Sequence, residues 1–247
     1  MNESRRYHLI DAIRAAAVIS MILYHLFFDI FCIFGGHPEY SKLTSIILWE
    51  QSICVTFIMI SGISLNFSRH GYRRGIIVGV CAMIVTLVTF FMSPDETIWF
   101  GILHFFCFAM LLSTALRRLL DRMRPLVGMI VFFLLFMLCY GIPSGCIGLF
   151  SYPLIRLPEA LYQYRQLSFL GFLSKDFITL DYFPILPWIF LYWFGCQLWR
   201  FIKEKQLDRF FCRRIPILDF IGRHSLIIYM LHQPILYGIC YLVFKHQ

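Results

Sequence analysis

Long apolar segments alternate with short polar ones along the whole chain, and this pattern predicts a series of helices that cross a lipid bilayer. A helix needs about 20 apolar residues to span a hydrocarbon layer about 30 Å thick. Seven segments meet or approach this length, at residues 10–34, 43–67, 75–93, 99–117, 126–142, 184–202 and 222–244. The fifth segment is the shortest, because Pro143 and Gly145 end it early. We therefore expect an all-α, polytopic membrane helix bundle with about seven transmembrane helices.

Two connecting segments are longer than a tight turn. Residues 143–183 are rich in aromatic residues and leucine, which predicts an external re-entrant or interfacial element that caps a cavity open to the outside. Residues 203–220 are basic and amphipathic, which predicts a segment along the lipid headgroups that anchors the last helix. The sequence shows no internal repeat and no separate soluble domain, so we expect one membrane domain over residues 1–247.

Composition supports the membrane interpretation. Hydrophobic residues make up 60% of the chain and charged residues 15%, with a mean hydropathy of +0.73, which indicates an integral membrane protein. No cleavable signal peptide is apparent, so the first helix is expected to stay attached. Six of the nine cysteines lie singly inside apolar segments and no Cys-x-x-Cys pair occurs. We therefore expect packing cysteines rather than disulfides or a metal site.

The basic residues predict the orientation of the chain. They form short clusters between apolar segments, which is typical of cytoplasmic loops that face anionic lipid and not of nucleic-acid binding. Fifteen fall on one face of the predicted bundle, namely Arg5, Arg6, Arg69, Arg73, Arg74, Arg117, Arg118, Arg122, Arg124, Arg200, Lys203, Lys205, Arg209, Arg213 and Arg214. The opposite face has Lys42, Arg156, Arg165, Lys175 and Lys245. This asymmetry predicts a plasma or inner membrane protein with its N-terminus in the cytoplasm and its C-terminus outside.

Four ionisable residues lie on one stripe of the first predicted helix, namely Asp11, Arg14, His25 and Asp29. At about 100° per residue they fall within about 60° of one another around the helix axis. An ionisable group at mid-bilayer costs about 2.5 to 3.5 kcal/mol on insertion scales, so it normally faces a protein interior or a watery cavity. The stripe is therefore a candidate functional site.

Two pairs of residues on this stripe suggest different chemistry. Histidine titrates near neutral pH, so His25 can take and return a proton, as a general base must. Asp29, one helical turn later, is placed to hold the ring and to stabilise its charged form. The alternative is that both side chains only hydrogen-bond a neighbouring helix. Asp11 and Arg14 are equally well an ordinary i,i+3 ion pair or a ligand contact.

Four segments resemble the catalytic-domain family named for heparan-alpha-glucosaminide N-acetyltransferase, in its small bacterial form. They are IDAIRAAAVISMILYHLFFD (10–29), GILHFFCFAMLL (101–112), DYFPILPWIFLYWFG (181–195) and GRHSLIIYMLHQP (222–234). The spacing of Arg14 and His25 is also similar to the signature of the wider transmembrane acyltransferase group, which includes the acyltransferase-3 proteins of surface-polysaccharide modification. The resemblance implies transfer of an acetyl group from cytoplasmic acetyl-CoA to a sugar hydroxyl or amine beyond the membrane.

The resemblance leaves two candidates for the catalytic base. The lysosomal enzyme of the family places its catalytic histidine in the loop after the first helix, where this chain has His37, and has another polar residue in the position of His25. We favour His25, because the acyltransferase-3 pattern matches it and because Asp29 supports it locally. Ala15 is a second departure, since the family has glycine after the first-helix arginine. The added methyl group widens the helix face expected to pack against the cofactor.

The expected binding residues for acetyl-CoA lie on three helices. Asp11 and Arg14 are candidates at the cytoplasmic end of the first helix, and Arg223 is a candidate partner for a CoA phosphate or for a lipid phosphate. His104 on the fourth helix is either a packing residue or a functional one, and the resemblance favours function.

The expected binding residues for the acceptor lie nearer the outer side. Asp181 precedes the sixth helix and is a candidate substrate ligand, with a helix N-cap as the alternative. His232 and Gln233 lie near the predicted membrane midplane and are also candidate substrate ligands. The acceptor, a carbohydrate or amino sugar, would enter from outside under residues 143–183.

Two functional hypotheses follow from these residues. The leading one is an acyltransferase in which His25 acts as general base or as acyl carrier. The rival is a proton-coupled secondary transporter in which His25, Asp29 and His104 relay protons. The sequence has neither an inverted repeat nor a pair of broken helices, which weighs against the transporter. Membrane lipid is an expected partner, a homodimer is left open, and no nucleic-acid partner is expected.

Overall fold

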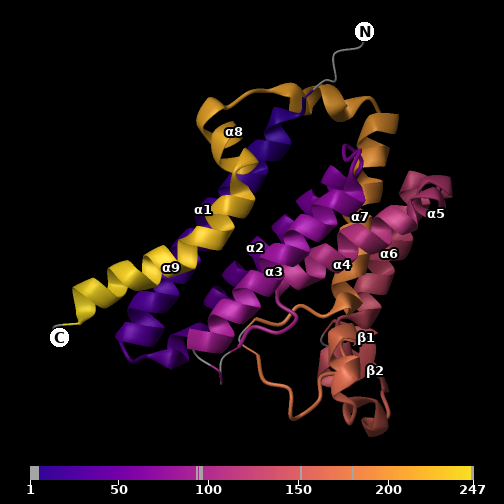
Figure 1. Ribbon diagram of the computed structural model, residues 1–247. Helices are drawn as coiled ribbons and strands as arrows, with labels where there is room; N and C mark the ends of the chain where they lie inside the picture. Colours follow the sequence, from indigo (N-terminus) through magenta and orange to yellow (C-terminus); the bar gives the residue numbers. More distant parts are fainter. Residues whose placement is uncertain (1–5, 93, 95–96, 151, 180, 246–247) are drawn as a thin grey trace. The chain divides into compact units, whose positions relative to one another are not determined.

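The structure, a computed structural model, describes residues 6–92, 94, 97–150, 152–179 and 181–245 (Figure 1). Its α-helices are α1 (His8–Phe27), α2 (Thr44–Leu65), α3 (Gly71–Met92), α4 (Ile102–Ala115), α5 (Arg117–Arg122), α6 (Pro125–Cys139), α7 (Ile185–Glu204), α8 (Pro216–Arg223) and α9 (Ser225–Phe244). A π-helix at Phe28–Phe34 continues α1. Strands β1 (Cys146–Leu149) and β2 (Tyr152–Arg156) form one small sheet. Short 3-10 turns occupy Pro38–Lys42, Ile142–Ser144, Glu159–Tyr162, Arg165–Leu170 and Leu207–Cys212.

The helices confirm the predicted all-α polytopic fold. Among the described residues, six helices are long and apolar enough to cross a membrane, at His8–Phe34, Thr44–Leu65, Gly71–Met92, Pro125–Ser144, Ile185–Glu204 and Ser225–Phe244. The chain is therefore a multi-pass membrane protein.

The span predicted at residues 99–117 is shorter than expected. It forms α4, which has 14 residues and is therefore about 21 Å long. The helix begins late because Phe100 has a left-handed φ of 55° and Gly101 is extended. Its length falls below the ~30 Å thickness of a hydrocarbon layer.

The chain divides into two compact units, residues 1–60 with 203–247 and residues 61–202. We describe each unit by itself. The first contains α1 with its π-helix, the part of α2 up to Ile60, the end of α7 from Lys203, α8, α9 and the 3-10 turns at Pro38–Lys42 and Leu207–Cys212. The second contains the remaining elements. This division reflects only how densely the parts of the chain pack. It does not test the expectation of one membrane domain over residues 1–247, which stays a prediction.

In the first unit, α8 packs against α1, and α9 packs against α1 and the π-helix. Ala12, Ala15 and Val18 are buried along α1, and such small residues allow neighbouring helices to approach closely. Gly222 of α8 touches α1 directly, since a Cβ at this position would collide with the carbonyl oxygen of Asp11. Ala15 is fully buried on α1, so its methyl group is accommodated inside the protein.

The segment between α7 and α9 differs from the prediction in one respect. The expected amphipathic helix is present as α8, with Asp219 buried and Ile217 and Phe220 exposed. The last long helix was predicted to begin at residue 222, but it begins at Ser225, because the chain leaves helical geometry at His224. A lipid-headgroup position for α8 stays a prediction.

In the second unit, α3 packs against α4 through glycines. Gly71, Gly75 and Gly79 recur at every fourth position, and a Cβ at any of them would meet a side chain of α4. This spacing of small residues is the common way for membrane helices to pack without a hydrophobic driving force. Trp199 and Tyr192 of α7 fill the interior of the same unit.

Residues 143–183 contain strands that the sequence analysis did not predict. β1 and β2 pair antiparallel, with Cys146 opposite Arg156, and every residue of β2 is exposed. Gly145 lies directly before β1 and Phe150 lies between β1 and β2, and they have left-handed φ angles of 86° and 51°. The strands were missed because runs of four and five residues are too short to give a distinct alternation. An interfacial position outside the membrane stays a prediction.

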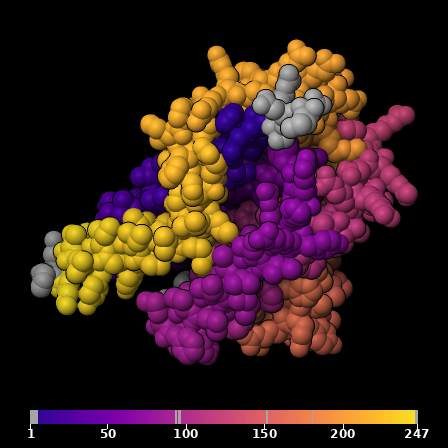
Figure 2. Space-filling model, turned by 45° about the horizontal axis from the view of Figure 1, so that its top comes forward, coloured from indigo at the N-terminus to yellow at the C-terminus, as the bar shows by residue number. Residues whose placement is uncertain are grey.

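The last helix leaves much of its apolar surface uncovered. Figure 2 shows α9 as the yellow helix, and its exposed large apolar side chains are Ile227, Leu231, Ile235, Ile239, Leu242 and Val243. In a multi-pass protein, such a surface is expected to contact lipid. His232 of the same helix is buried and does not belong to this surface.

Candidate functional site

His25 and His232 face each other in the first unit. His25 lies on α1 and His232 on α9, and their ring centroids are 4.8 Å apart with the ring planes inclined by 61°. Both helices are long enough to cross a membrane, so the pair lies within membrane-crossing segments. The sequence analysis selected both residues but did not predict their contact.

His232 is held in one tautomer by its own helix. Its Nδ1 lies 2.5 Å from the carbonyl oxygen of Tyr229. Because a carbonyl oxygen only accepts hydrogen bonds, we assign the ring proton to Nδ1, which leaves a lone pair on Nε2. This Nε2 is buried and has no hydrogen-bond partner in the described part of the chain. The ring of His25 contacts Tyr24 and His232 and makes no hydrogen bond with any described residue.

Asp29 bonds to α9 and not to His25. Its Oδ1 accepts a hydrogen bond of 2.9 Å from Nε2 of Gln233. The expected bond between Asp29 and the His25 ring does not form, because the helix widens into a π-helix at Phe28 and the angular offset between the two residues changes. Asp29 instead ties the π-helix to α9 beside His232.

Two oxygen atoms of the Asp29–Gln233 pair have no hydrogen-bond partner among the described residues. Oδ2 of Asp29 and Oε1 of Gln233 are buried, and neither has a hydrogen-bond partner among the residues that the structure describes. Buried polar atoms without partners are rare in folded proteins, and they often mark a catalytic role or a bound molecule. π-helical turns are likewise frequent at functional sites.

A second polar pair borders His25. The hydroxyl of Tyr24 donates a hydrogen bond of 3.0 Å to Oε2 of Glu50, and its ring lies edge-on to the His25 ring at 5.5 Å. Nε1 of Trp49 donates to Oγ of Ser20 at 2.8 Å, which fixes the start of α2 against α1. The sequence analysis missed Tyr24, because a tyrosine in an apolar helix usually serves packing.

Asp11 and Arg14 form the expected ion pair near the start of α1. Nη1 of Arg14 lies 2.8 Å from Oδ1 of Asp11, and Nη2 of Arg6 lies 3.1 Å from Oδ2. Nη1 of Arg14 is also 3.5 Å from the carbonyl oxygen of Gly222. The Arg14 side chain remains 21% exposed, so a contact with CoA stays a prediction that the geometry permits.

His8 and Asp219 form a buried pair that the sequence analysis missed. Nδ1 of His8 lies 2.7 Å from Oδ2 of Asp219, and the Asp219 side chain is fully buried. Nε of Arg214 approaches the same oxygen at 3.6 Å. An available signal was the position of Asp219 three residues before Gly222, which places both on one face of a short amphipathic helix. The pair ties α8 to the first turn of α1.

Arg223 ends α8 and does not open the last helix. Its Nε donates a hydrogen bond of 3.0 Å to the carbonyl oxygen of Asp219, and the residue is exposed. This bond uses one of the five N–H donors of the guanidinium group. A phosphate contact at Arg223 therefore stays a prediction.

His37, the alternative base, lies in an exposed turn. Its Nδ1 is 3.0 Å from Oε1 of Glu39, its side chain is 54% exposed, and its ring stacks on Tyr40 with the centroids 5.2 Å apart. A hydrogen bond from its own backbone N–H, and then the bond to His37, lower the pKa of the Glu39 carboxyl group. His37 thus has an acidic partner, Glu39, which was not recognised from the sequence.

His104 and Asp181 lie in the second unit, and each has a structural partner there. Oγ1 of Thr86 donates to the carbonyl oxygen of Ile98 at 2.7 Å, so the contact of 3.3 Å with Nε2 of His104 requires the histidine to donate. Oδ2 of Asp181 accepts a hydrogen bond of 3.0 Å from the backbone N–H of Ile102. Asp181 therefore caps a helix as the alternative proposed, but the helix is α4 instead of its own.

Among the described residues, no group of three or more His, Cys, Asp or Glu side chains is arranged to hold a metal ion. The first unit instead brings together two histidines, a buried carboxylate and an amide on membrane-crossing helices. The two histidines and the carboxylate can accept, hold and release protons, and the amide donates a hydrogen bond to the carboxylate. The fold and this cluster define a multi-pass membrane protein that carries acid–base side chains on its membrane-crossing helices.

A family model described as heparan-alpha-glucosaminide N-acetyltransferase, catalytic, matches residues 6–234. The chain belongs to this family, which makes it a membrane protein of an acetyltransferase class. No curated protein and no solved structure matches the chain. The family identified from four sequence segments is thereby confirmed, and the transporter hypothesis is not favoured.

Proposed function

We propose that this protein moves an acetyl group from cytoplasmic acetyl-CoA to a hydroxyl or amine of a sugar or glycan on the outer side of the membrane. Membership of the acetyltransferase family supports the reaction class. The uneven distribution of basic residues supports a cytoplasmic N-terminus and an external C-terminus in the cell membrane.

The contact between His25 and His232 carries the proposal. In our reaction scheme His25 takes the proton of the acceptor hydroxyl or amine, whose oxygen or nitrogen then attacks the thioester carbon. The carbon–sulfur bond breaks, and the proton passes from His25 to the departing sulfur to give free CoA. In an alternative scheme a ring nitrogen of His25 attacks the thioester carbon, the carbon–sulfur bond breaks, and the departing sulfur takes the ring proton to give free CoA. The acceptor oxygen or nitrogen then attacks the acetyl carbon, the bond to the ring nitrogen breaks, and the acceptor's proton returns to His25.

His232 and Asp29 support His25 in this scheme. The free Nε2 lone pair of His232 is suited to share the proton that His25 receives, because the two rings are in contact. The carboxylate of Asp29 holds Gln233, the residue next to His232, and so fixes α9 at the distance that the pair requires. We thus revise the role of Asp29 from a direct partner of His25 to a positioning residue.

The donor would bind towards the cytoplasmic end of α1. Arg14 and Arg223 are the proposed phosphate contacts, and both retain exposed guanidinium surface beside their protein partners. Asp11 holds Arg14 in place from one turn away. His104, Asp181 and Gln233 remain proposed contacts for donor or acceptor.

Acetyl transfer by the purified protein tests this function. The protein would be placed in proteoliposomes, with acetyl-CoA on the cytoplasmic side and a panel of amino sugars and glycans on the other. We expect acetylated acceptor and free CoA in equal amounts, and saturable acetyl-CoA binding in detergent. Absence of both binding and transfer would contradict the proposal, and a transporter has no reason to bind acetyl-CoA.

A further inference from the structure

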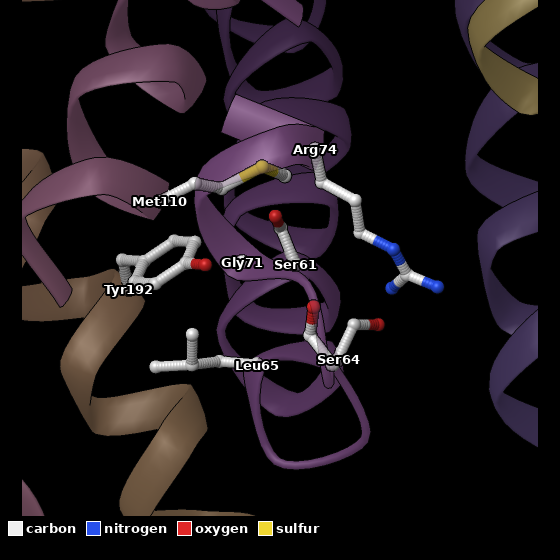
Figure 3. Close-up of a pocket in the computed structure, with 8 residues that line it drawn as sticks. Ser61, Ser64, Leu65, Gly71, Arg74, Met110 and Tyr192 are labelled. Carbon is white, nitrogen blue, oxygen red and sulfur yellow. The ribbon is translucent and has the colours of Figure 1, made fainter. Parts of the chain in front are cut away.

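A small pocket lies in the second unit, where α2 ends and α3 begins (Figure 3). It is partly open to solvent, with about 250 Å³ of empty space that includes this open part, and it is lined by Ser61, Ser64, Leu65, Ser68, Gly71, Arg74, Met110 and Tyr192. Figure 3 shows Tyr192 and Met110 on one side and the guanidinium group of Arg74 on the other. A pocket of this size holds one small group and not a whole nucleotide.

Three serines are among the residues that line this pocket. Ser61 and Ser64 are one turn apart on α2, and Ser68 follows in the turn after the helix, so the three line one side. The hydroxyl of Tyr192 is hydrogen-bonded to Ser61. Oγ of Ser68 is buried and has no hydrogen-bond partner among the described residues. A buried hydroxyl without a partner is costly unless a ligand or water completes it.

The charge around the pocket is positive. The guanidinium group of Arg74 is exposed, and no described residue pairs with it. Arg117 donates hydrogen bonds of 3.1 and 3.3 Å to the carbonyl oxygens of Leu65 and Ser68, which places a second guanidinium group next to two of the lining residues. None of the residues that line the pocket is acidic. Asp121, the acid nearest to this group, is paired with Arg117 at 3.6 Å.

We infer that this pocket binds a phosphate group through Arg74 and the serine hydroxyls. A phosphate oxygen accepts several hydrogen bonds at once, and a guanidinium group binds it with two parallel N–H donors. An apolar ligand would leave the Ser68 hydroxyl without a partner, and a cation would be repelled by Arg74. Arg69, Arg73 and Arg74 all fall on the predicted cytoplasmic face, where phosphate esters and anionic lipid are both present.

Two molecules can supply this phosphate. One is the nucleotide end of CoA, and this source rests on the proposed function. The other is the headgroup of an anionic phospholipid, which does not rest on it. The chemistry is the same in both cases, so the experiment needs one arm for each.

The test compares Arg74→Gln with Arg73→Gln, because Arg73 is the neighbouring exposed arginine and does not line the pocket. In the CoA arm, affinity is measured for CoA and for pantetheine, which lacks the nucleotide phosphates. In the lipid arm, phosphatidylglycerol retained by the detergent-purified protein is measured by native mass spectrometry. Ser68→Ala is a second pocket variant, and its loss of an unpaired hydroxyl should not impair folding.

We expect Arg74→Gln to weaken binding in one arm by about 10- to 100-fold, as the loss of a charge-assisted hydrogen bond implies. Ser68→Ala should weaken the same arm, whereas Arg73→Gln and all pantetheine affinities should be unchanged. If only the lipid arm responds and wild type does not bind CoA, the pocket inference holds and the proposed function fails. If wild type binds CoA but Arg74→Gln matches Arg73→Gln in both arms, the inference is overturned and the proposed function stands.

Discussion

The rings of His25 and His232 are in contact, with centroids 4.8 Å apart, although one lies on the first helix and the other on the last. His232 donates from Nδ1 to the carbonyl oxygen of Tyr229, so its Nε2 keeps a lone pair. The two rings are inclined by 61°, and each lies on a helix long enough to cross a membrane. The contact therefore joins two ionisable side chains from opposite ends of the sequence.

His25→Ala should lower acetyl transfer by about 10²- to 10⁴-fold, the range for loss of a general base. Acetyl-CoA binding should remain nearly intact, because most of that binding energy lies far from the thioester. His37→Ala is the matched variant, and its effect should be mild, since the His37 side chain is exposed and already bonded to Glu39. Turnover in proteoliposomes measures both. If His25→Ala keeps near-normal turnover and His37→Ala loses it, the catalytic base is His37 and not His25.

Gln233→Leu should destabilise the protein more than Asp29→Asn. The leucine would leave the buried Asp29 carboxylate without its bond, at a cost of about 1 to 3 kcal/mol or more. An asparagine at position 29 keeps an oxygen that accepts from Gln233, so folding should suffer less. Thermal unfolding in detergent shows which of the two variants is less stable. For activity, Asp29→Asn should fall between wild type and His25→Ala, and full activity would show that the carboxylate charge is not needed.

Arg14→Ala should weaken acetyl-CoA binding by about 1.5 to 3 kcal/mol, as expected for one charge-assisted phosphate contact. Arg156→Ala and Arg165→Ala are controls on the predicted outer face and should bind normally. Asp11 keeps Arg6 as a partner at 3.1 Å, so the variant should fold. Titration calorimetry in detergent measures the affinities. Equal losses in all three variants would be inconsistent with a donor site at the cytoplasmic end of α1.

Arg200→Met should destabilise the second unit by at least about 1.5 to 3 kcal/mol, the contribution of one charge-assisted hydrogen bond. The guanidinium group donates to the carbonyl oxygens of residues 120, 121 and 123 and to Oε1 of Gln197, at 2.6 to 3.1 Å. These bonds hold the end of α5 against α7. Arg118→Met removes an exposed arginine of α5 and should leave thermal unfolding unchanged. A similar unfolding temperature for both variants would refute the role of Arg200.

An alkaline phosphatase fused after Gln247 should be active, because the fifteen-to-five distribution of basic residues places the N-terminus inside and seven crossings, α4 included, place the C-terminus outside. A fusion within residues 203–206 should be inactive, since the model of orientation places this segment in the cytoplasm. An inactive C-terminal fusion would mean that one predicted span does not cross. The first span to re-examine would be α4, which has only 14 residues.

The positions of the helices could be predicted from the sequence, because hydropathy is a property of consecutive residues. Every predicted span overlaps a helix of the structure. The stripe on α1 could be predicted as well, and the Asp11–Arg14 pair is present as expected, since a helix fixes the geometry of residues three apart. The same reasoning failed for His25 and Asp29, because the π-helix alters that geometry from Phe28 onward.

By itself, the sequence determined the membrane class, the approximate helix ends, the family resemblance and most of the candidate residues. Only the tertiary structure decided which of them meet: His25 with His232, Asp29 with Gln233, His8 with Asp219, and Asp181 with the start of α4. These pairs join residues that are 79 to 211 positions apart in the sequence. Hydropathy and helical spacing describe only neighbours along one helix, whereas such contacts depend on how different helices pack against each other.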